Sequence, residues 1–408
     1  MIESWKQSGL VAVVVIAAAV FGAWMQAWSL DQGLVAPSPV ATAPISIDWS
    51  HRLAVYTGQV SAEQTASGRV EVRAVMTWDV TAGKLAASFE SGGIGAYSVG
   101  IALVGRDVVF ATEQQVVEAA LDGTGLRRVF AAGDGNVIQD MAISPDGRLV
   151  AIVVTPKDVP REGAVRVVDL QTLQERLVVK QSDSRFAGIR GVFWQVQWRG
   201  DGTGVLVHTG TQSEMWGSLA TIFLDGRVRI EDVQGYGNVS PTGRMRAGDI
   251  GAIGCMFVGA NQLVIRDLET RSVPLRAGGP DSSTVYTPWE WSPDGSQFVF
   301  FQQEATTCEE LSSEKQVAYV VQTNGSSFPG APIRVSDLAA LHREWYGDNL
   351  FTADCDHGDE PVVDRWGKLR PLCFLQSGPG PYRAVTVRVG GQAIGTAVDP
   401  QPVGVITP

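Results

Sequence analysis

A short motif recurs seven times along this chain. In each copy an apolar residue leads into a tight polar turn, and an apolar segment follows at once. The copies begin at Trp49, Leu103, Ile143, Trp198, Val239, Trp291 and Trp345, so neighbouring copies lie 40 to 55 residues apart. A repeat of this length indicates small, similar units that stack on one another. The repeat constrains the fold more than any single residue does.

The segments around these turns predict β-strands. Runs such as LVAIVV from Leu149 and QFVFFQ from Gln297 are short, rich in β-branched or aromatic residues and bounded by turn signals. A second hairpin closes each unit, and Asp-Gly or Asn-Gly pairs supply the positive φ that tight turns need. Four strands in each of seven units predict an all-β, seven-bladed β-propeller over residues 45–376, followed by a C-terminal hairpin and tail over residues 377–408. A six-bladed ring is the alternative, because the second and fifth units are irregular.

Two copies of the turn are especially regular. Ile143–Gly147 reads ISPDG and Trp291–Gly295 reads WSPDG. This motif resembles the repeat of TolB-like and WD-repeat-like bacterial β-propellers. The proline presets φ, the aspartate can bond back to the turn amides, and the glycine takes the left-handed conformation. Propellers of this kind include periplasmic adaptors, receptors and gating domains of peptidases, so the resemblance implies an architecture and no single activity.

The N-terminal segment predicts a membrane anchor. Residues 10–28 contain no charged residue and are long enough to cross a bilayer as a helix. Lys6 precedes this stretch and Asp31 follows it, which favours a cytoplasmic N-terminus and a propeller outside the cytoplasm. We therefore expect a cytoplasmic segment over residues 1–9, a signal anchor over residues 10–30 and a proline-rich tether over residues 31–44. A cleaved signal peptide is the alternative.

Charge and cysteine content bear on partners and compartment. The net charge of −11 argues against nucleic-acid binding, which needs a basic surface. The four cysteines, an even number, suit disulfides in an exported chain. We expect Cys255 to pair with Cys308 and Cys355 with Cys373, because these pairings join only neighbouring blades. A zinc site is the weaker interpretation, since no Cys-x-x-Cys motif accompanies these residues.

Loop length predicts a working face. Turns after the first and third strands of each unit are short, whereas connections after the second and fourth are long, at residues 156–163, 181–191, 209–217, 276–288 and 304–315. Long loops on a rigid scaffold often carry function, although they can also be neutral insertions. We call their side the long-loop face. The candidate binding residues are Trp216 and Tyr286 in long loops, Trp194 and Trp289 in strands, and Arg190. The strand tryptophans, which are Trp194, Trp198, Trp289 and Trp291, could instead pack between blades.

Catalytic patterns are weak. The nearest match to a hydrolase nucleophile elbow, at residues 96–100, begins with alanine instead of glycine. An acidic run at residues 354–360 departs from the standard spacing of a calcium loop. We therefore assign no catalytic residue, no metal and no cofactor.

The sequence as a whole predicts a membrane-anchored, extracytoplasmic binding or assembly module for a protein or glycan partner. A hydrolase with a pocket in the central funnel is the alternative from a different class. A scaffold subunit of a larger membrane complex is the third interpretation.

The anchor can be tested directly. If residues 10–30 stay in the membrane, protein extracted from membranes should retain Met1 or Ile2 at its N-terminus, as N-terminal sequencing would show. A soluble mature protein that begins near Trp28 or later would contradict the anchor.

Overall fold

The computed structural model describes residues 47–65, 68–95, 100–158, 162–187, 189, 191–210, 218–231, 237–250, 261–279, 282–304, 316–324, 327–353, 361–363, 369–371 and 384–408. All of them belong to the unit Ala43–Pro408. The expected anchor, the four cysteines, Trp216 and Arg190 lie outside the described residues. Within the described ranges, no helix is both long and apolar enough to cross a bilayer.

Five antiparallel sheets of four strands each follow one another in the sequence. Sheet B contains β4 (Ile101–Val104), β5 (Asp107–Ala111), β6 (Gln115–Ala120) and β7 (Arg127–Ala131). Sheet C contains β8 (Asn136–Ile143), β9 (Leu149–Pro156), β10 (Ala164–Asp169) and β11 (Glu175–Lys180). Sheet D contains β12 (Val192–Trp198), β13 (Gly204–Gly210), β14 (Leu219–Phe223) and β15 (Val228–Glu231). Sheet E contains β16 (Gly237–Val239), β17 (Met245–Ile250), β18 (Gln262–Asp267) and β19 (Leu275–Gly278). Sheet F contains β20 (Thr284–Trp291), β21 (Gln297–Glu304), β22 (Val317–Gln322) and β23 (Ile333–Arg334).

The sixth large sheet, sheet A, joins strands from both ends of the described chain. Its order is β24 (Phe351–Ala353), β27 (Ala384–Val389), β28 (Gln392–Ile406), β1 (Leu53–Thr65), β2 (Gly68–Asp79) and β3 (Lys84–Gly95). A two-stranded sheet pairs β25 (Pro361–Val363) with β26 (Leu369–Pro371). The described helices are α2 (Leu338–Tyr346) and the 3₁₀ turns η2 (Ser184–Phe186) and η5 (Gly347–Asn349).

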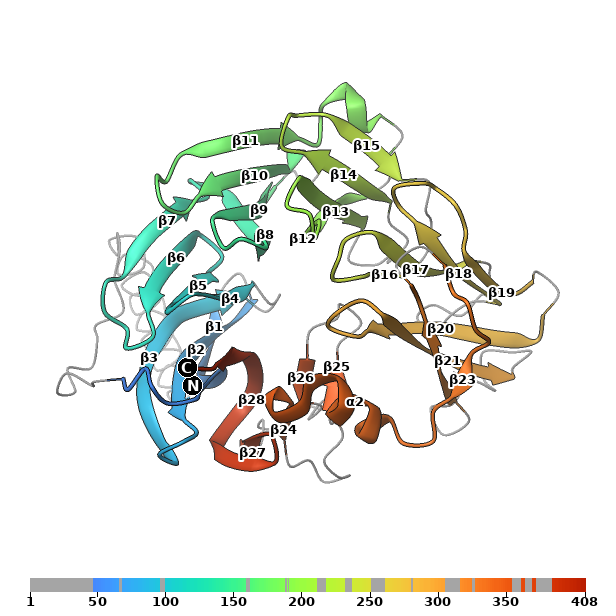
Figure 1. The fold of residues 1–408 in the computed structure, drawn as a ribbon. Coiled ribbons are helices and arrows are strands. Elements are labelled where there is room, and N and C mark those ends of the chain that lie inside the picture. Colours follow the sequence, from blue (N-terminus) through green and yellow to red (C-terminus); the bar gives the residue numbers. More distant parts are fainter. Residues whose placement is uncertain are drawn as a thin grey trace, which may run out of the picture. The chain divides into compact units, whose positions relative to one another are not determined.

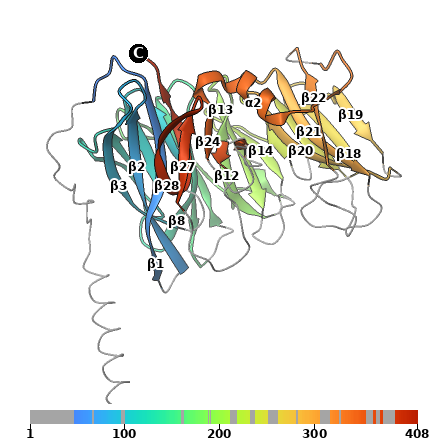
Figure 2. The same ribbon diagram turned by 90° about the horizontal axis from the view of Figure 1, so that it is seen from below.

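Sheets A to F succeed one another around a common centre in the order of the sequence (Figure 1), and the first strands of sheets B to F are innermost. Figure 2 shows the same sheets from the side. Buried apolar side chains fill the spaces between neighbours, as between sheets B and C around Val109 and Ile152, and between sheets E and F around Ile265 and Phe300. Four-stranded antiparallel sheets stacked face to face are consistent with a β-propeller.

The turn chemistry expected from the sequence is confirmed in the regular copies. Gly147 and Gly295 both have a φ of 71°, a conformation that only glycine adopts without strain. The carboxylate of Asp146 accepts hydrogen bonds from the Ser144 hydroxyl at 2.6 Å and from the Arg148 backbone N–H at 3.1 Å. Asp294 accepts equivalent bonds in sheet F. These turns therefore close the first hairpin of each sheet locally.

Two tryptophans that open a turn also connect sheets. The Trp198 indole N–H donates to the Ala142 carbonyl in sheet C at 2.9 Å, and the Trp291 indole N–H donates to the Asn238 carbonyl in sheet E at 3.1 Å. Both rings are buried, with exposed fractions of 4 % and 5 %. A tryptophan here fills the gap between first strands and satisfies a backbone carbonyl of the preceding sheet. The inter-blade interpretation is thus right for these two residues.

The seventh copy of the motif is not a turn between strands. Trp345 lies in α2, which begins after Asp337, whose side chain accepts a hydrogen bond from the Ala340 N–H. This is an N-cap, and it lets the local sequence form a helix. The first copy also differs, because β1 has β28 as its inner neighbour instead of a strand that precedes Trp49. Only the copies in sheets B to F form the predicted hairpin.

A buried polar pair holds α2 against sheet F. His342 Nε2 and Glu290 Oε1 are hydrogen-bonded, and both side chains are completely buried. Burial raises the pKa of Glu290, and the bond to His342 opposes that rise. The Trp345 indole N–H also donates to the Gln297 side chain at 2.8 Å. Helix α2 therefore lies between sheet F and β24 of sheet A (Figures 1 and 2).

Removing one member of this pair should be costly. We expect His342→Leu or Glu290→Leu to lower the free energy of unfolding by about 3–5 kcal/mol, because each leaves the other polar group buried without its partner. The double variant should lose less than the sum of the two single losses. Urea unfolding measures all three, with the exposed Arg343→Ala as control. Strictly additive losses would contradict a direct interaction.

Candidate functional site

The first strands of sheets B to E surround a cavity of about 300 Å³. Its lining comes from β4, β8, β12 and β16, with one residue from β13: Ile101, Ala102, Asp140, Met141, Ala142, Ile143, Gln195, Val196, Gln197, His208, Asn238 and Val239. The volume is at the lower end of the range for small-molecule sites. Polar side chains in otherwise apolar first strands distinguish this cavity from the packed spaces between sheets.

Gln195 and His208 occupy opposing positions on β12 and β13. Side chains at directly opposed positions of an antiparallel pair share one face and lie close together. The β12 register shifts between Phe193 and Gln195, which marks a β-bulge at Trp194. A bulge re-aims the side chains that follow it. In β12, Phe193, Val196 and Trp198 are core residues, while Gln195 lines the cavity.

Asp140 reaches the cavity from β8, which also has a register shift, between Ile138 and Asp140. Its carboxylate Oδ2 accepts a hydrogen bond from the Val196 backbone N–H in β12 at 3.1 Å, and only 7 % of the residue is exposed. The side chain thus links the first strands of two sheets. Because it is nearly buried in the cavity wall, its charge is felt strongly inside.

His208 is held in its neutral form. Burial lowers the pKa of His208 to about 3, and the positive charge of the nearby Arg246 acts in the same direction. A neutral imidazole presents one N–H donor and one acceptor nitrogen. With so low a pKa it is a weak base at neutral pH, so it suits hydrogen bonding better than proton transfer.

Two further carboxamides border the cavity, and each is oriented by one hydrogen bond. Gln197 donates its Nε2 to the Ser240 carbonyl at 3.3 Å, and Asn238 donates its Nδ2 to the Trp289 carbonyl. Among the described residues, neither side-chain carbonyl oxygen has a hydrogen-bond partner. The cavity wall therefore offers these two oxygens as acceptors and the second N–H of each carboxamide as a donor.

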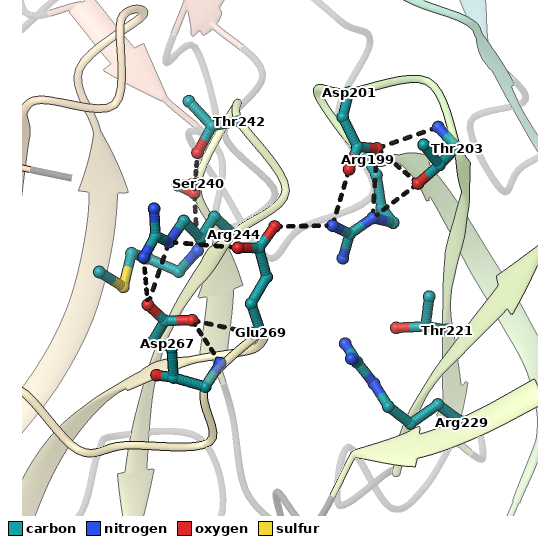
Figure 3. Close-up of polar contacts among 12 residues, drawn as sticks. Arg199, Asp201, Thr203, Thr221, Arg229, Ser240, Thr242, Arg244, Asp267 and Glu269 are labelled. Carbon is teal, nitrogen blue, oxygen red and sulfur yellow. Dashed lines mark hydrogen bonds and ion pairs between the residues drawn. The ribbon is translucent and has the colours of Figure 1, made fainter. Parts of the chain in front are cut away.

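A network of charged side chains ties sheets D and E together at the turns beyond the cavity (Figure 3). We call it the polar clasp: Arg199, Asp201, Arg244, Asp267 and Glu269. Arg199, with a side chain only 6 % exposed, contacts Asp201 at 2.8 Å and Glu269 of sheet E at 3.0 Å. Arg244 contacts Asp267 at 2.9 Å. Because charge networks with good geometry resist separation, the clasp fixes the spacing of sheets D and E.

The apolar part of this interface is small. The buried cluster between sheets D and E contains Leu206, Leu219, Val239 and Leu268. The cluster between sheets C and D is larger and contains aromatic anchors such as Phe193 and Trp198. The D–E interface thus has polar groups at both ends, at the cavity and at the clasp. The clasp groups are paired with one another, whereas Gln195 and His208 in the cavity have no hydrogen-bond partner among the described residues.

The expected site residues are only partly brought together. Tyr286 lies in β20 instead of a loop, is 9 % exposed and packs on Phe300. The predicted loop at residues 276–288 is therefore wrong, because the connection between β19 and β20 spans only residues 279–283. Trp289 packs edge-on against Phe301. Trp194 is half-buried in β12, beside Gln195. Trp216 and Arg190 lie outside the described residues.

The cavity residues were missed at the sequence level. Asp140, Gln195, Gln197 and Asn238 lie in first strands, which line a central cavity, and His208 lies in β13, the second strand of sheet D. The available signal was a polar residue that interrupts an apolar first strand two to four residues before its turn. Over the described residues, no group of three or more His, Cys, Asp or Glu side chains is placed to hold a metal ion.

No family model and no curated protein matches the chain. Solved structures give distant similarity. Hydrazine synthase of Kuenenia stuttgartiensis is 16 % identical, with a TM-score of 0.39 over 72 % of this chain and 78 % of that one. A functionally unknown protein of Desulfotomaculum acetoxidans is 12 % identical, with a TM-score of 0.44 over 86 % and 98 %. Dipeptidyl peptidase 4 of Porphyromonas gingivalis is 10 % identical, with a TM-score of 0.46 over 84 % and 50 %.

The lowered pKa of His208 has a measurable consequence. Between pH 6.5 and pH 3 only the unfolded chain takes up this proton, so wild-type stability should fall by up to about 1.4 kcal/mol per pH unit below 6.5. His208→Gln should remove that part of the decline. Urea unfolding at pH 7, 5.5 and 4.5 measures it, and parallel declines of wild type and variant would contradict a buried neutral His208.

His51 provides a control, because its pKa is shifted in the opposite direction from that of His208. Its Nδ1 lies 2.7 Å from Asp79, and this hydrogen bond raises the pKa of His51. The stability it contributes is complete below pH 6.5 and is lost as the pH rises through the raised value. His51→Gln should therefore parallel wild type between pH 6.5 and 4.5 and differ in slope only above pH 6.5.

Proposed function

We propose that this protein is a membrane-anchored, extracytoplasmic β-propeller that acts as a binding or assembly module for a protein or glycan partner. The cavity carries the proposal, because its polar groups suit recognition. His208 is neutral and weakly basic, and Gln195, Gln197 and Asn238 are uncharged groups that can both donate and accept hydrogen bonds. Such groups fix the orientation of a ligand in a concave site.

The partner is proposed to approach the long-loop face. On the opposite face the turns after the first strands are tight, as at residues 144–148 and 199–203, where the backbone closes within the turn. The connection after the third strand of sheet F, residues 323–332, is longer than the sequence predicted. Connections between the second and third strands are longer in sheets C to F, for example residues 157–163 between β9 and β10. Trp216, between β13 and β14, and Arg190, between β11 and β12, are proposed as contacts.

The ring is proposed to have seven blades of the TolB-like or WD-repeat-like kind. The seven copies of the turn motif support that number, and sheets A to F, each of four or more strands, account for six blades among the described residues. An uncleaved helix over residues 10–30 is proposed to hold the ring outside the cytoplasm, as a single-pass anchor. The uncharged stretch at residues 10–28 supports it.

A hydrolase of the cell envelope is the second candidate function. It is favoured by one observation: the carboxylate of Asp140 and the imidazole of His208 line the same cavity. Against it, Asp140 already accepts the Val196 N–H, and His208 is poorly suited to act as a base near neutral pH. The scaffold-subunit interpretation differs from the binding module only in its partners, which would be other membrane proteins.

The working face can be tested with two substitutions. Full-length protein in mild detergent captures its partner, and the affinity of that complex is then measured for each variant. Trp216→Ala should weaken the complex by about 2 kcal/mol or more, as the loss of an aromatic anchor does. Arg148→Ala, in a short turn with a side chain 57 % exposed, should change the affinity by less than roughly 0.5 kcal/mol.

Both variants must first show the same thermal midpoint as wild type, because a tryptophan packed between blades would act indirectly. An equal loss of affinity for the two variants, or a loss of affinity with Arg148→Ala alone, would show that the partner does not bind on the long-loop face.

A further inference from the structure

Two polar side chains in the cavity make no hydrogen bonds of their own. Gln195 and His208 have no hydrogen-bond partner among the described residues, although their strands pair directly opposite one another. Two other glutamines of the described first strands do make a side-chain hydrogen bond: Gln139 donates to Thr155 at 2.7 Å and Gln197 to Ser240 at 3.3 Å. Polar groups withdrawn from bulk water are normally bonded. These two are therefore available to a molecule that enters the cavity.

The donors and acceptors of the cavity wall select the chemistry of that molecule. The side-chain oxygens of Asp140, Gln195, Gln197 and Asn238 and one nitrogen of His208 can accept. The Gln195 amide, the His208 N–H and the second amide N–H of Gln197 and of Asn238 can donate. A ligand whose polar groups both donate and accept satisfies such a wall. Each hydroxyl does both at a single atom.

The charged residues at the cavity further restrict which ligands can bind. Asp140 is nearly buried in the wall and disfavours an anionic ligand. Arg246, which acts electrostatically on His208, is 3 % exposed, and its positive charge disfavours a cation beside the imidazole. The volume of about 300 Å³ admits a small group and not a folded segment.

We propose that this cavity binds one uncharged sugar unit, free or at the end of a glycan, through Gln195 and His208. The inference rests on the proposed binding function and names the ligand class of the same site. Gln195 and His208 both bond one hydroxyl, the oxygens of Gln197 and Asn238 accept from others, and Asp140 excludes sugar acids.

The test uses full-length protein in detergent and four monosaccharides that differ mainly in charge: glucose and N-acetylglucosamine, which are neutral, glucosamine, which is cationic, and glucuronic acid, which is anionic. Titration calorimetry or ligand-observed NMR measures binding, and a tri-alanine peptide that is acetylated and amidated at its ends, and is therefore uncharged, serves as the alternative ligand. At least one neutral sugar should bind at least 10-fold more tightly than the charged sugars and the peptide.

Gln195→Ala should reduce sugar binding at least 10-fold without changing the thermal midpoint, because the side chain makes no hydrogen bond that folding depends on. The matched control is Gln302→Ala, a half-buried glutamine of β21 that does not line the cavity, and it should leave binding unchanged. His208→Gln, which keeps a donor and an acceptor, should retain part of the affinity.

Absence of binding by every neutral sugar overturns the inference, as does tighter binding of the peptide or a Gln195→Ala variant with wild-type affinity. If a partner is nevertheless captured and lost on Trp216→Ala, the binding function stands and only the ligand class is wrong. If neither sugar nor partner binds, both proposals fail.

Discussion

The pairing of β28 with β1 is the interaction on which the rest of the structure depends. It places Leu53 opposite Ile406, Ala54 opposite Val405 and Val55 opposite Gly404, so that the two ends of the described chain share one sheet. The Tyr56 hydroxyl adds a hydrogen bond to the Ile394 carbonyl at 3.2 Å. A row of stacked sheets leaves the first and the last sheet without a neighbour on one side, and such an uncovered sheet is prone to pair with other chains. Sheet A contains strands from both ends of the described chain, so it is the first and the last sheet at once, and one uncovered sheet is removed.

Closure also sets the geometry of the cavity. The first strands line it only because the sheets behind them are held at fixed spacings. Apolar clusters do this between most neighbours, the polar clasp does it between sheets D and E, and the His342–Glu290 pair does it where α2 replaces a sheet contact. The unmatched polar groups at Gln195 and His208 lower stability. A rigid frame tolerates that cost at a site where a ligand supplies the missing bonds.

Local features of the fold could be predicted from the sequence, and non-local ones could not. The Ser-Pro-Asp-Gly turns and the strands after them follow from the conformational preferences of a few adjacent residues, and they were confirmed at Gly147 and Gly295. The pairing of β28 with β1 joins residues that are far apart in the sequence, and no local pattern encodes it. Helix α2 was missed because the residues that begin at Trp345 resemble the turn motif.

The cavity was missed for a related reason. A glutamine or histidine in a strand has the same local signal whether it faces solvent or a central space. The bulges at Gln139 and Trp194, which accompany the placement of Asp140 and Gln195, depend on pairing with neighbouring strands. Aromatic residues were easier to notice, but Tyr286 and Trp291 proved to be packing residues. Large side chains mark the core of this fold more often than its site.

Native-state hydrogen exchange tests the central claim most directly. If the β1–β28 pairing closes the structure, the amides of β28 that bond to β1 should exchange only through global unfolding, with the same protection free energy as the amides in the β12–β13 ladder beside the cavity. Exchange of the β28 amides at much lower free energy, while the β12–β13 amides stay protected, would show that sheets B to F are stable without closure and would contradict the account.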